Sequence, residues 1–277
     1  MKKIVSLFLL LFLLPSLFSL NVSADVGPKP SVTVTIKNAP DKSYYVTFLG
    51  DREPYGPWRK VSDVSLKEDA SDRDKAYAYF ANYNEADGYI FLGNMSEDLK
   101  GFDSFSWTYY PPDSFKIAIY SPEDDTFFVS EICEREAFNS YFEITYGSSE
   151  VKEESHFGKD FFHGVLRALV TVVVELALGY LFGFREKKQI LTILIVNLIT
   201  QLLLNIGLML TDYFAGALVW LVMFMIFEIA VIVIEMIVYL FAMRKQKKWK
   251  LVLYAILANV LSGALTFYSV FLSWVGI

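Results

Sequence analysis

The feature that most constrains this chain is a run of thirty residues, 214–243, that is apolar almost throughout. Such a run predicts a membrane-spanning helix, because about 20 apolar residues are enough to cross a bilayer. It nevertheless contains two acids, Glu228 and Glu235. An ionisable side chain within a span costs roughly 2.5–3.5 kcal/mol on insertion scales, so its presence needs a reason. The two acids are seven residues apart, which places them on one face of a helix.

Two more apolar runs precede this one in the sequence and a third follows it. The four together predict a four-helix transmembrane domain over residues 164–277. The predicted spans are 165–184, 190–210, 214–243 and 251–272. Two of the short connections, 185–189 and 244–248, are rich in Lys and Arg, whereas 211–213 is not. Since basic loops remain inside the cell, we expect a multi-pass plasma-membrane protein with loops 185–189 and 244–248 in the cytoplasm.

The first 24 residues have the pattern of a secretory signal peptide. Lys2 and Lys3 precede an apolar stretch, 4–20, and small residues around Ala24 suit cleavage. The alternative is an uncleaved N-terminal anchor. Either interpretation places residues 25–160 outside the cytoplasm, in agreement with the basic loops.

Charge divides the chain in the same way. Residues 25–160 hold 26 acidic and 14 basic side chains, a net charge of −12, whereas the remainder holds 5 acidic and 11 basic, a net charge of +6. The two parts therefore face different surroundings. The single cysteine, Cys133, excludes an intrachain disulfide, and a packed apolar role is favoured over a reactive thiol.

Residues 25–149 predict an extracytoplasmic all-β domain. Short runs of β-branched and aromatic residues alternate with turn residues, which is typical of a sandwich, with an immunoglobulin-like arrangement as one form of it. Residues 61–75 suit a loop or short helix, 131–138 a helical turn, 121–125 a hairpin loop and 150–163 a linker. The expected strands are 31–37, 44–49, 77–83, 89–92, 105–109, 115–120, 126–130 and 141–146.

Nothing in this domain indicates catalysis, since no histidine precedes His156. Glu123, Asp124 and Asp125 could bind calcium, but they lack the ligand spacing of a dedicated loop, and a solvated turn is favoured. The many aromatic side chains form either the core or an exposed binding face. We therefore expect no catalytic residue, cofactor or metal, and a non-enzymatic role is favoured.

Each predicted span carries polar residues on one side of its helix. Counting inward from the cytoplasmic ends sorts them into three layers of a bundle. The inner layer holds Glu175, Asn197, Glu235 and Asn259. The middle layer holds Thr171, Gln201 and Ser262. The outer layer holds Arg167, Asn205, Glu228 and Thr266.

Three interpretations of these layers remain open. Interhelical hydrogen bonds, some of them donated by protonated acids, can hold a bundle together in lipid. Alternatively, Glu175, Glu228 and Glu235 line a proton or cation path, or a small-molecule site. An intramembrane enzyme is the third, although the spans lack histidine and cysteine and we expect the acids to form neither an aspartyl dyad nor a Glu–Glu pair. Arg167 either pairs with Glu228 or extends toward the outer interface.

Three segments, FSWTYYPP (105–112), FKIAIY (115–120) and EREAFNSYF (134–142), resemble an uncharacterised Gram-positive family. The resemblance implies an exported β-domain followed by several membrane helices, and it brings no activity and no assigned residues. From the whole sequence we expect an envelope interaction or sensing module. Its partners are the lipid bilayer that surrounds its helices and another membrane or envelope protein. Nucleic acid is not an expected partner, and an oligomer is compatible with four spans. A proton- or cation-coupled transport component is the alternative.

Overall fold

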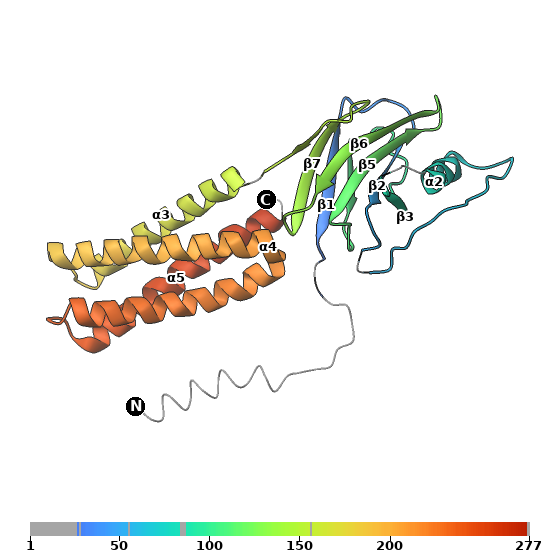
Figure 1. Ribbon diagram of the computed structural model, residues 1–277. Helices are drawn as coiled ribbons and strands as arrows, with labels where there is room; N and C mark the ends of the chain where they lie inside the picture. Colours follow the sequence, from blue (N-terminus) through green and yellow to red (C-terminus); the bar gives the residue numbers. More distant parts are fainter. Residues whose placement is uncertain (1–26, 28, 55, 84–86, 156, 276–277) are drawn as a thin grey trace.

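The structure is a computed structural model that describes residues 27, 29–54, 56–83, 87–155 and 157–275. The predicted signal peptide, 1–24, lies outside the described residues. A β-rich domain stands at one end of the molecule and long apolar helices extend away from it (Figure 1). The fold is therefore α+β, with strands first and helices second, as the sequence predicts.

The β-domain consists of two four-stranded sheets. All strand pairs are antiparallel except the first with the seventh strand, which run parallel in full register. One sheet has the order β4 (Ser104–Trp107), β1 (Ser31–Lys37), β7 (Asn139–Thr145), β8 (Val151–Glu153). The other has the order β3 (Ile90–Met95), β2 (Tyr45–Gly50), β5 (Ser114–Ser121), β6 (Thr126–Glu134).

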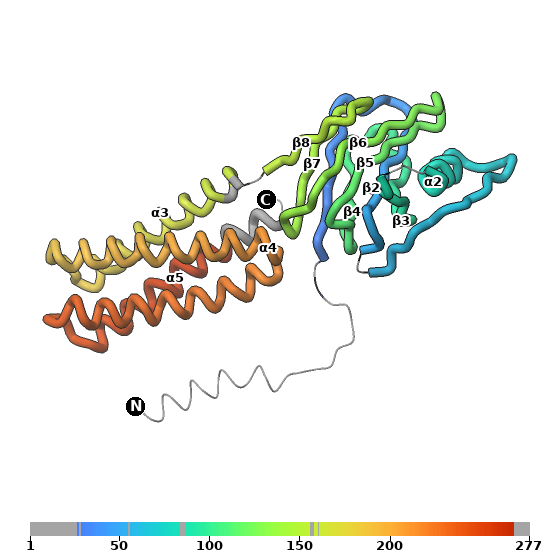
Figure 2. Tube along the Cα trace, in the orientation of Figure 1, coloured from blue at the N-terminus to red at the C-terminus, as the bar shows by residue number. Residues whose placement is uncertain are grey.

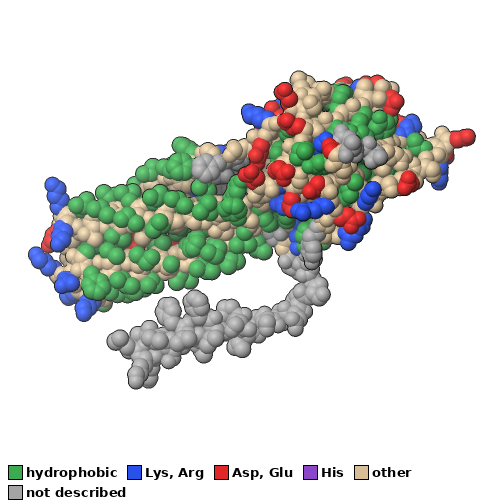
Figure 3. All heavy atoms as spheres, in the orientation of Figure 1, with side chains coloured by type: hydrophobic (Ala, Val, Ile, Leu, Met, Phe, Trp, Pro, Cys, Tyr) green, Lys and Arg blue, Asp and Glu red, His purple; other side chains and the backbone are tan. Residues whose placement is uncertain are grey.

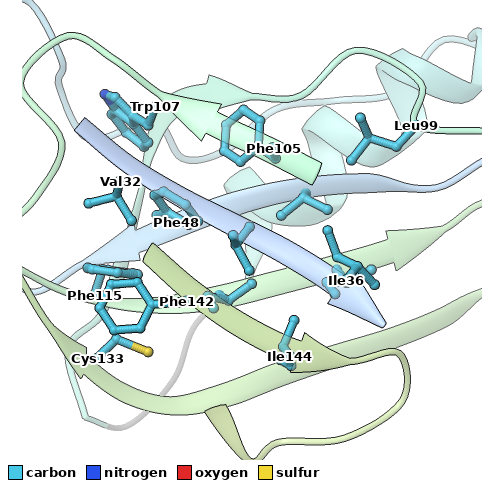
Figure 4. Packing of buried hydrophobic residues seen from close by; sticks show 14 of the residues in the cluster. Val32, Ile36, Phe48, Leu99, Phe105, Trp107, Phe115, Cys133, Phe142 and Ile144 are labelled. Carbon is cyan, nitrogen blue, oxygen red and sulfur yellow. The ribbon is translucent and has the colours of Figure 1, made fainter. Parts of the chain in front are cut away.

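One hydrophobic cluster fills the space between the two sheets (Figure 4). Alternate residues of β1 point into it, because successive side chains of a strand face opposite sides. Phe48 of β2 stacks on Trp107 of β4 with ring centroids 5.9 Å apart and meets Phe115 at 4.8 Å. Tyr44, Tyr45 and Trp107 are buried in the cores of the domain, whereas Tyr109 is exposed, so the aromatic residues divide between core and surface.

A helix covers the other face of the β2–β5 sheet, and it corrects the strand predicted at 77–83. α2 (Asp72–Asn82) begins with a capping box, in which Ser71 and Asp74 bond each other's backbone N–H. Its Phe80 packs against the outer face of the sheet in a second cluster. Every residue of β2 is buried because both of its faces are covered.

Two further expectations for this domain are wrong in detail. The helical turn expected at 131–138 is absent, because β6 continues to Glu134 and pairs with β5. The linker expected at 150–163 contains β8 and the beginning of the next helix, which starts at Phe157. The β-domain therefore joins the helices through a very short connection.

The described part of the chain contains three helices long and apolar enough to cross a membrane, where four were predicted. These are α3 (Phe157–Leu181), α4 (Lys187–Ala242) and α5 (Lys248–Val275). The second and third predicted spans belong to α4, and the loop expected at 211–213 is helical. Thr211 even donates to the carbonyl of Gly207, as a helical threonine does.

α4 doubles back on itself near its middle, at Gly216, whose backbone is not helical (φ 75°, ψ −179°). Residues 187–215 and 217–242 then lie side by side, as Figure 2 shows. A cluster containing Leu204, Leu208, Trp220 and Phe224 joins the two halves. A positive φ is readily adopted by glycine alone, which explains why the reversal occurs there.

The helices carry apolar side chains on the outside (Figure 3). Lys and Arg side chains gather at the end of the helices farthest from the β-domain, where loops 185–189 and 244–248 meet. Lys250 lies over the Phe184 ring at 5.2 Å, in the cluster that closes this end. The outer surface thus has an apolar middle and a basic end.

The β-domain contacts the reversal of α4 through Phe138, the residue before β7. Its backbone N–H donates to the carbonyl of Tyr213 at 2.7 Å. Its ring lies so close to Gly216 that a Cβ atom at that position would be 2.5 Å from it. This contact links the two parts of the molecule at a second place, besides the chain connection from β8 to α3.

Candidate functional site

The candidate site is a buried polar cluster among the three apolar helices, and it contains the whole predicted inner layer. Glu175 comes from α3, Asn197 and Glu235 from the two halves of α4, and Asn259 from α5. All four side chains are at most 1% exposed. The spacing of polar residues in the sequence therefore located a set that the fold brings together.

Glu235 has a complete set of hydrogen-bond donors. Thr200 Oγ1 donates to its Oε1 at 2.7 Å, and Asn259 Nδ2 donates to its Oε2 at 2.8 Å. The Tyr239 hydroxyl, one helical turn away, approaches Oε2 at 3.4 Å. Both carboxylate oxygens are thus hydrogen-bonded, which suits an ionised acid.

Glu175 has far fewer donors. Ser262 Oγ lies 3.3 Å from its Oε1, and the same hydroxyl lies 3.2 Å from the backbone carbonyl of Asn259. Tyr254 donates at 3.0 Å to the backbone carbonyl of Glu175 and not to its carboxyl group. Glu175 Oε2 has no hydrogen-bond partner although it is fully buried.

Two amide oxygens of the cluster are in the same situation as Glu175 Oε2. Asn197 Oδ1 and Asn259 Oδ1 are buried and have no hydrogen-bond partner, while both Nδ2 atoms donate. Three buried acceptors without a donor in one cluster are unusual, since most buried polar atoms of a folded protein are paired. The cluster has more acceptors than donors.

The middle and outer layers are progressively less enclosed. Thr171, Gln201 and Ser262 of the middle layer are buried. In contrast, Arg167, Asn205, Glu228 and Thr266 of the outer layer are only half-buried. The polar interior is therefore closed at the basic end of the helices and more open toward the β-domain.

The outer layer is also divided in two. Arg167 Nη2 and Asn205 Oδ1 both lie near Gly164, whereas the Glu228 carboxyl lies against Gly263 on α5. None of the ion pairs among the described residues joins Glu228 to Arg167, which is one of the two alternatives for Arg167. His163 is exposed near the start of α3.

Sequence reasoning missed three members of the cluster: Thr200, Tyr239 and Tyr254. Tyr239 follows Glu235 by four residues, so its place on the same face was readable from the sequence. Glu175 and Glu235 belong to one hydrogen-bonded cluster, connected through Ser262 and Asn259.

The acids predicted as a solvated turn in the β-domain lie in the β5–β6 hairpin. Lys42 bonds Asp124, which lowers the pKa of that carboxyl to about 2, and the Ser43 N–H donates to Glu123 at 3.1 Å. Cys133 is buried in the sheet core, and this burial raises the pKa of its thiol to about 12. These groups stabilise the fold and do not form a reactive site.

Comparison with protein-family models, with curated proteins and with solved structures gave no match to this chain.

Proposed function

We propose that this chain is an integral plasma-membrane protein acting as an envelope interaction or sensing module. Its outward-facing β-domain binds another membrane or envelope protein, and its helices respond through their contact with that domain. The β-domain is an immunoglobulin-like sandwich in this proposal, which the two packed sheets support.

The placement is supported by the distribution of side chains. Exposed apolar residues cover the helices, and the basic residues lie at the end away from the β-domain. The apolar middle suits lipid, and the basic end suits the cytoplasmic side of a bilayer. The β-domain is then extracytoplasmic.

The observation that carries the sensing role is the contact of Phe138 with the reversal of α4. The Phe138 N–H bonds the Tyr213 carbonyl, and its ring leaves no room for a side chain at Gly216. A partner that shifts β7 would therefore displace the point where the two halves of α4 meet. That displacement would reach the polar cluster, since Asn197 and Glu235 lie on opposite halves.

The placement can be tested by cysteine labelling of cells. Glu68→Cys lies in an exposed loop of the β-domain and Lys245→Cys in an exposed basic loop, while native Cys133 is buried and adds little background. A membrane-impermeant maleimide should label Glu68→Cys on intact cells and Lys245→Cys only after the membrane is opened. The opposite pattern would contradict the proposal.

The sensing role can be tested by photo-cross-linking in membranes. A photo-reactive amino acid replaces Ile132, which is exposed on β6. Gly216→Ala should change the yield of the cross-linked envelope protein relative to the parent chain. Gly101→Ala is the control and should give the parent yield, because an added Cβ at Gly101 meets nothing within 4 Å. An equal cross-linking yield in all three chains would contradict the proposed coupling between the β-domain and α4.

A proton- or cation-coupled transport component is the second candidate, because three partly or fully buried acids have no ion-pair partner among the described residues. Glu228→Gln and Glu235→Gln separate it from the first. If both variants fold and abolish a pH-dependent flux in liposomes, transport is favoured. If they change only thermal stability or partner recovery, the interaction module is favoured.

A further inference from the structure

The polar cluster has too few hydrogen atoms for its acceptors. Its side-chain donors are four hydroxyl groups and two amide groups, from Thr200, Tyr239, Tyr254, Ser262, Asn197 and Asn259. Each already has an acceptor within 3.4 Å. Three buried oxygens remain without a donor, namely Glu175 Oε2, Asn197 Oδ1 and Asn259 Oδ1.

Rearranging the groups that are present does not remove this deficit. Turning an asparagine amide over exchanges its oxygen and nitrogen, which changes the pairs but not the number of donors. A water molecule would donate two hydrogen bonds, yet it would leave both carboxyl groups charged. The cluster needs a donor that also carries positive charge.

The charged groups around Glu175 and Glu235 also indicate that the cluster lacks a positive charge. Glu175 is faced by Glu235, Tyr239 and Glu228 from α4 and by Tyr254 from α5, and none of these supplies a positive charge. No ion pair among the described residues contains Glu175 or Glu235. Two carboxylates buried together in this way cannot both stay ionised, because desolvation and mutual repulsion oppose it.

The hydrogen bonds assign the two acids different states. Glu235 accepts from Thr200, Asn259 and Tyr239, so its ionised form is stabilised. Glu175 Oε1 has only the Ser262 hydroxyl, at 3.3 Å, which also lies 3.2 Å from the Asn259 carbonyl, and Glu175 Oε2 is unpaired. Unequal environments of this kind are what divides two neighbouring acids into a protonated and an ionised member.

We propose that the cluster is a binding site for one proton, held on Glu175 Oε2 beside the ionised Glu235. The proton comes from water, forms an O–H bond on Oε2 and makes Glu175 a donor to a neighbouring amide oxygen. The side chain of Asn197 lies beside the Glu175 carboxyl, and with its amide turned so that Oδ1 faces Oε2 it would accept this bond. This site goes beyond the interaction role of the β-domain and does not depend on what that domain binds.

The test uses the purified full-length protein in detergent, with infrared spectroscopy as the direct measurement. The parent chain at neutral pH should show the carbonyl stretch of a buried protonated carboxyl group, and Glu175→Gln should lose it. Glu228→Gln is the matched control, because it is the same substitution at a carboxyl outside the hydrogen-bonded cluster; it should retain the band that Glu175→Gln loses. A parent spectrum without that band overturns the proposal.

A second measurement follows the thermal unfolding midpoint against pH. The folded protein holds one more proton than the unfolded chain at neutral pH, so stability should fall as pH rises, by about tenfold in the folding equilibrium constant per pH unit. Glu175→Gln should fold and lose this part of the pH dependence, because glutamine is neutral at every pH.

Sodium distinguishes the proton from a metal cation. At one pH and ionic strength, the midpoint should be the same in sodium chloride and in choline chloride. A rise specific to sodium, together with a missing carboxyl band, would assign the three oxygens to a monovalent cation and overturn the proton site.

Discussion

Asn259 on α5 donates a 2.8 Å hydrogen bond to Glu235 Oε2 on α4, while its own Oδ1 has no partner. The bond joins α5 to α4. The unpaired Oδ1 adds to the excess of hydrogen-bond acceptors in the cluster. Glu235 is therefore the common acceptor of three side-chain donors, Thr200, Asn259 and Tyr239.

Replacing Glu235 by alanine should destabilise the helices strongly. Thr200 Oγ1 and Asn259 Nδ2 would each lose their bond to a carboxylate. The Thr200 hydroxyl keeps backbone acceptors at 3.0 and 3.2 Å, whereas one N–H of Asn259 is left unpaired, at a cost of about 1–3 kcal/mol for a buried donor. Glu228→Ala is the control, because the Glu228 carboxyl is only half-buried and makes no such bonds. Thermal unfolding in detergent measures both, and an equal loss in the two variants would contradict this role of Glu235.

Gly216→Ala should loosen the contact between the β-domain and α4. The added Cβ would lie 2.5 Å from the Phe138 ring, and φ of 75° is unfavourable for alanine. Hydrogen exchange of the Phe138 amide, which bonds the Tyr213 carbonyl, should become faster.

Gly101→Ala is the control for alanine at a positive-φ glycine that has no contact with Phe138. Gly101 has φ of 77°, but a Cβ atom added there would have nothing within 4 Å, so its replacement adds backbone strain without a clash. Exchange at Phe138 should be unchanged in this variant. If Gly216→Ala also leaves the exchange rate of the Phe138 amide unchanged, the Phe138 ring does not exclude a side chain at position 216.

The β-domain should lose stability in acid through Asp124. Its hydrogen bond with Lys42 lowers the pKa of Asp124 from 3.8 to about 2 in the folded protein. Because the folded pKa is below the unfolded value, this stabilisation is present above pH about 4 and is lost as pH falls toward about 2. Asp124→Asn should remove that part of the pH dependence, as measured by unfolding between these pH values.

Cys133 should be unreactive while the β-domain is folded. Burial raises the pKa of its thiol to about 12, so almost no thiolate forms at pH 8. Mass spectrometry after maleimide treatment should find it unmodified in the native protein and modified after denaturation. Ile132→Cys is a suitable control one residue away, since Ile132 is 53% exposed and the new thiol should react quickly. Equal rates at 132 and 133 would contradict the assigned burial.

The sequence indicated most of the β-domain because alternation and turn residues are local signals. It failed at 77–83, where tyrosines and a phenylalanine favour a strand by propensity. The Ser71–Asp74 capping box is the opposing signal, and the apolar outer face of the β2–β5 sheet, which α2 covers, is the tertiary reason for a helix. The polar residues 211–213 predict the reversal of α4 there, whereas the backbone reverses at Gly216.

For the candidate site, spacing alone identified the inner layer, since residues one helical turn apart share a face. It does not single out Tyr254, because a tyrosine in an apolar run resembles any other aromatic residue, although the spacing of four from Glu235 places Tyr239 on the same face. Nor could it show that Arg167 lies near Asn205 on one side while Glu228 lies against Gly263 on the other. That division depends on how the helices are rotated, which follows from packing and not from sequence spacing.

The two attachments of the β-domain restrict how it can turn. β8 ends at Glu153 and α3 begins at Phe157, while Phe138 meets α4 at its reversal. A rigid body fixed at one point can swivel in any direction, but one fixed at two separated points can rock only about the line that joins them. A sideways load on the β-domain would therefore reach α3 and α4 as a torque that shears one helix against the other.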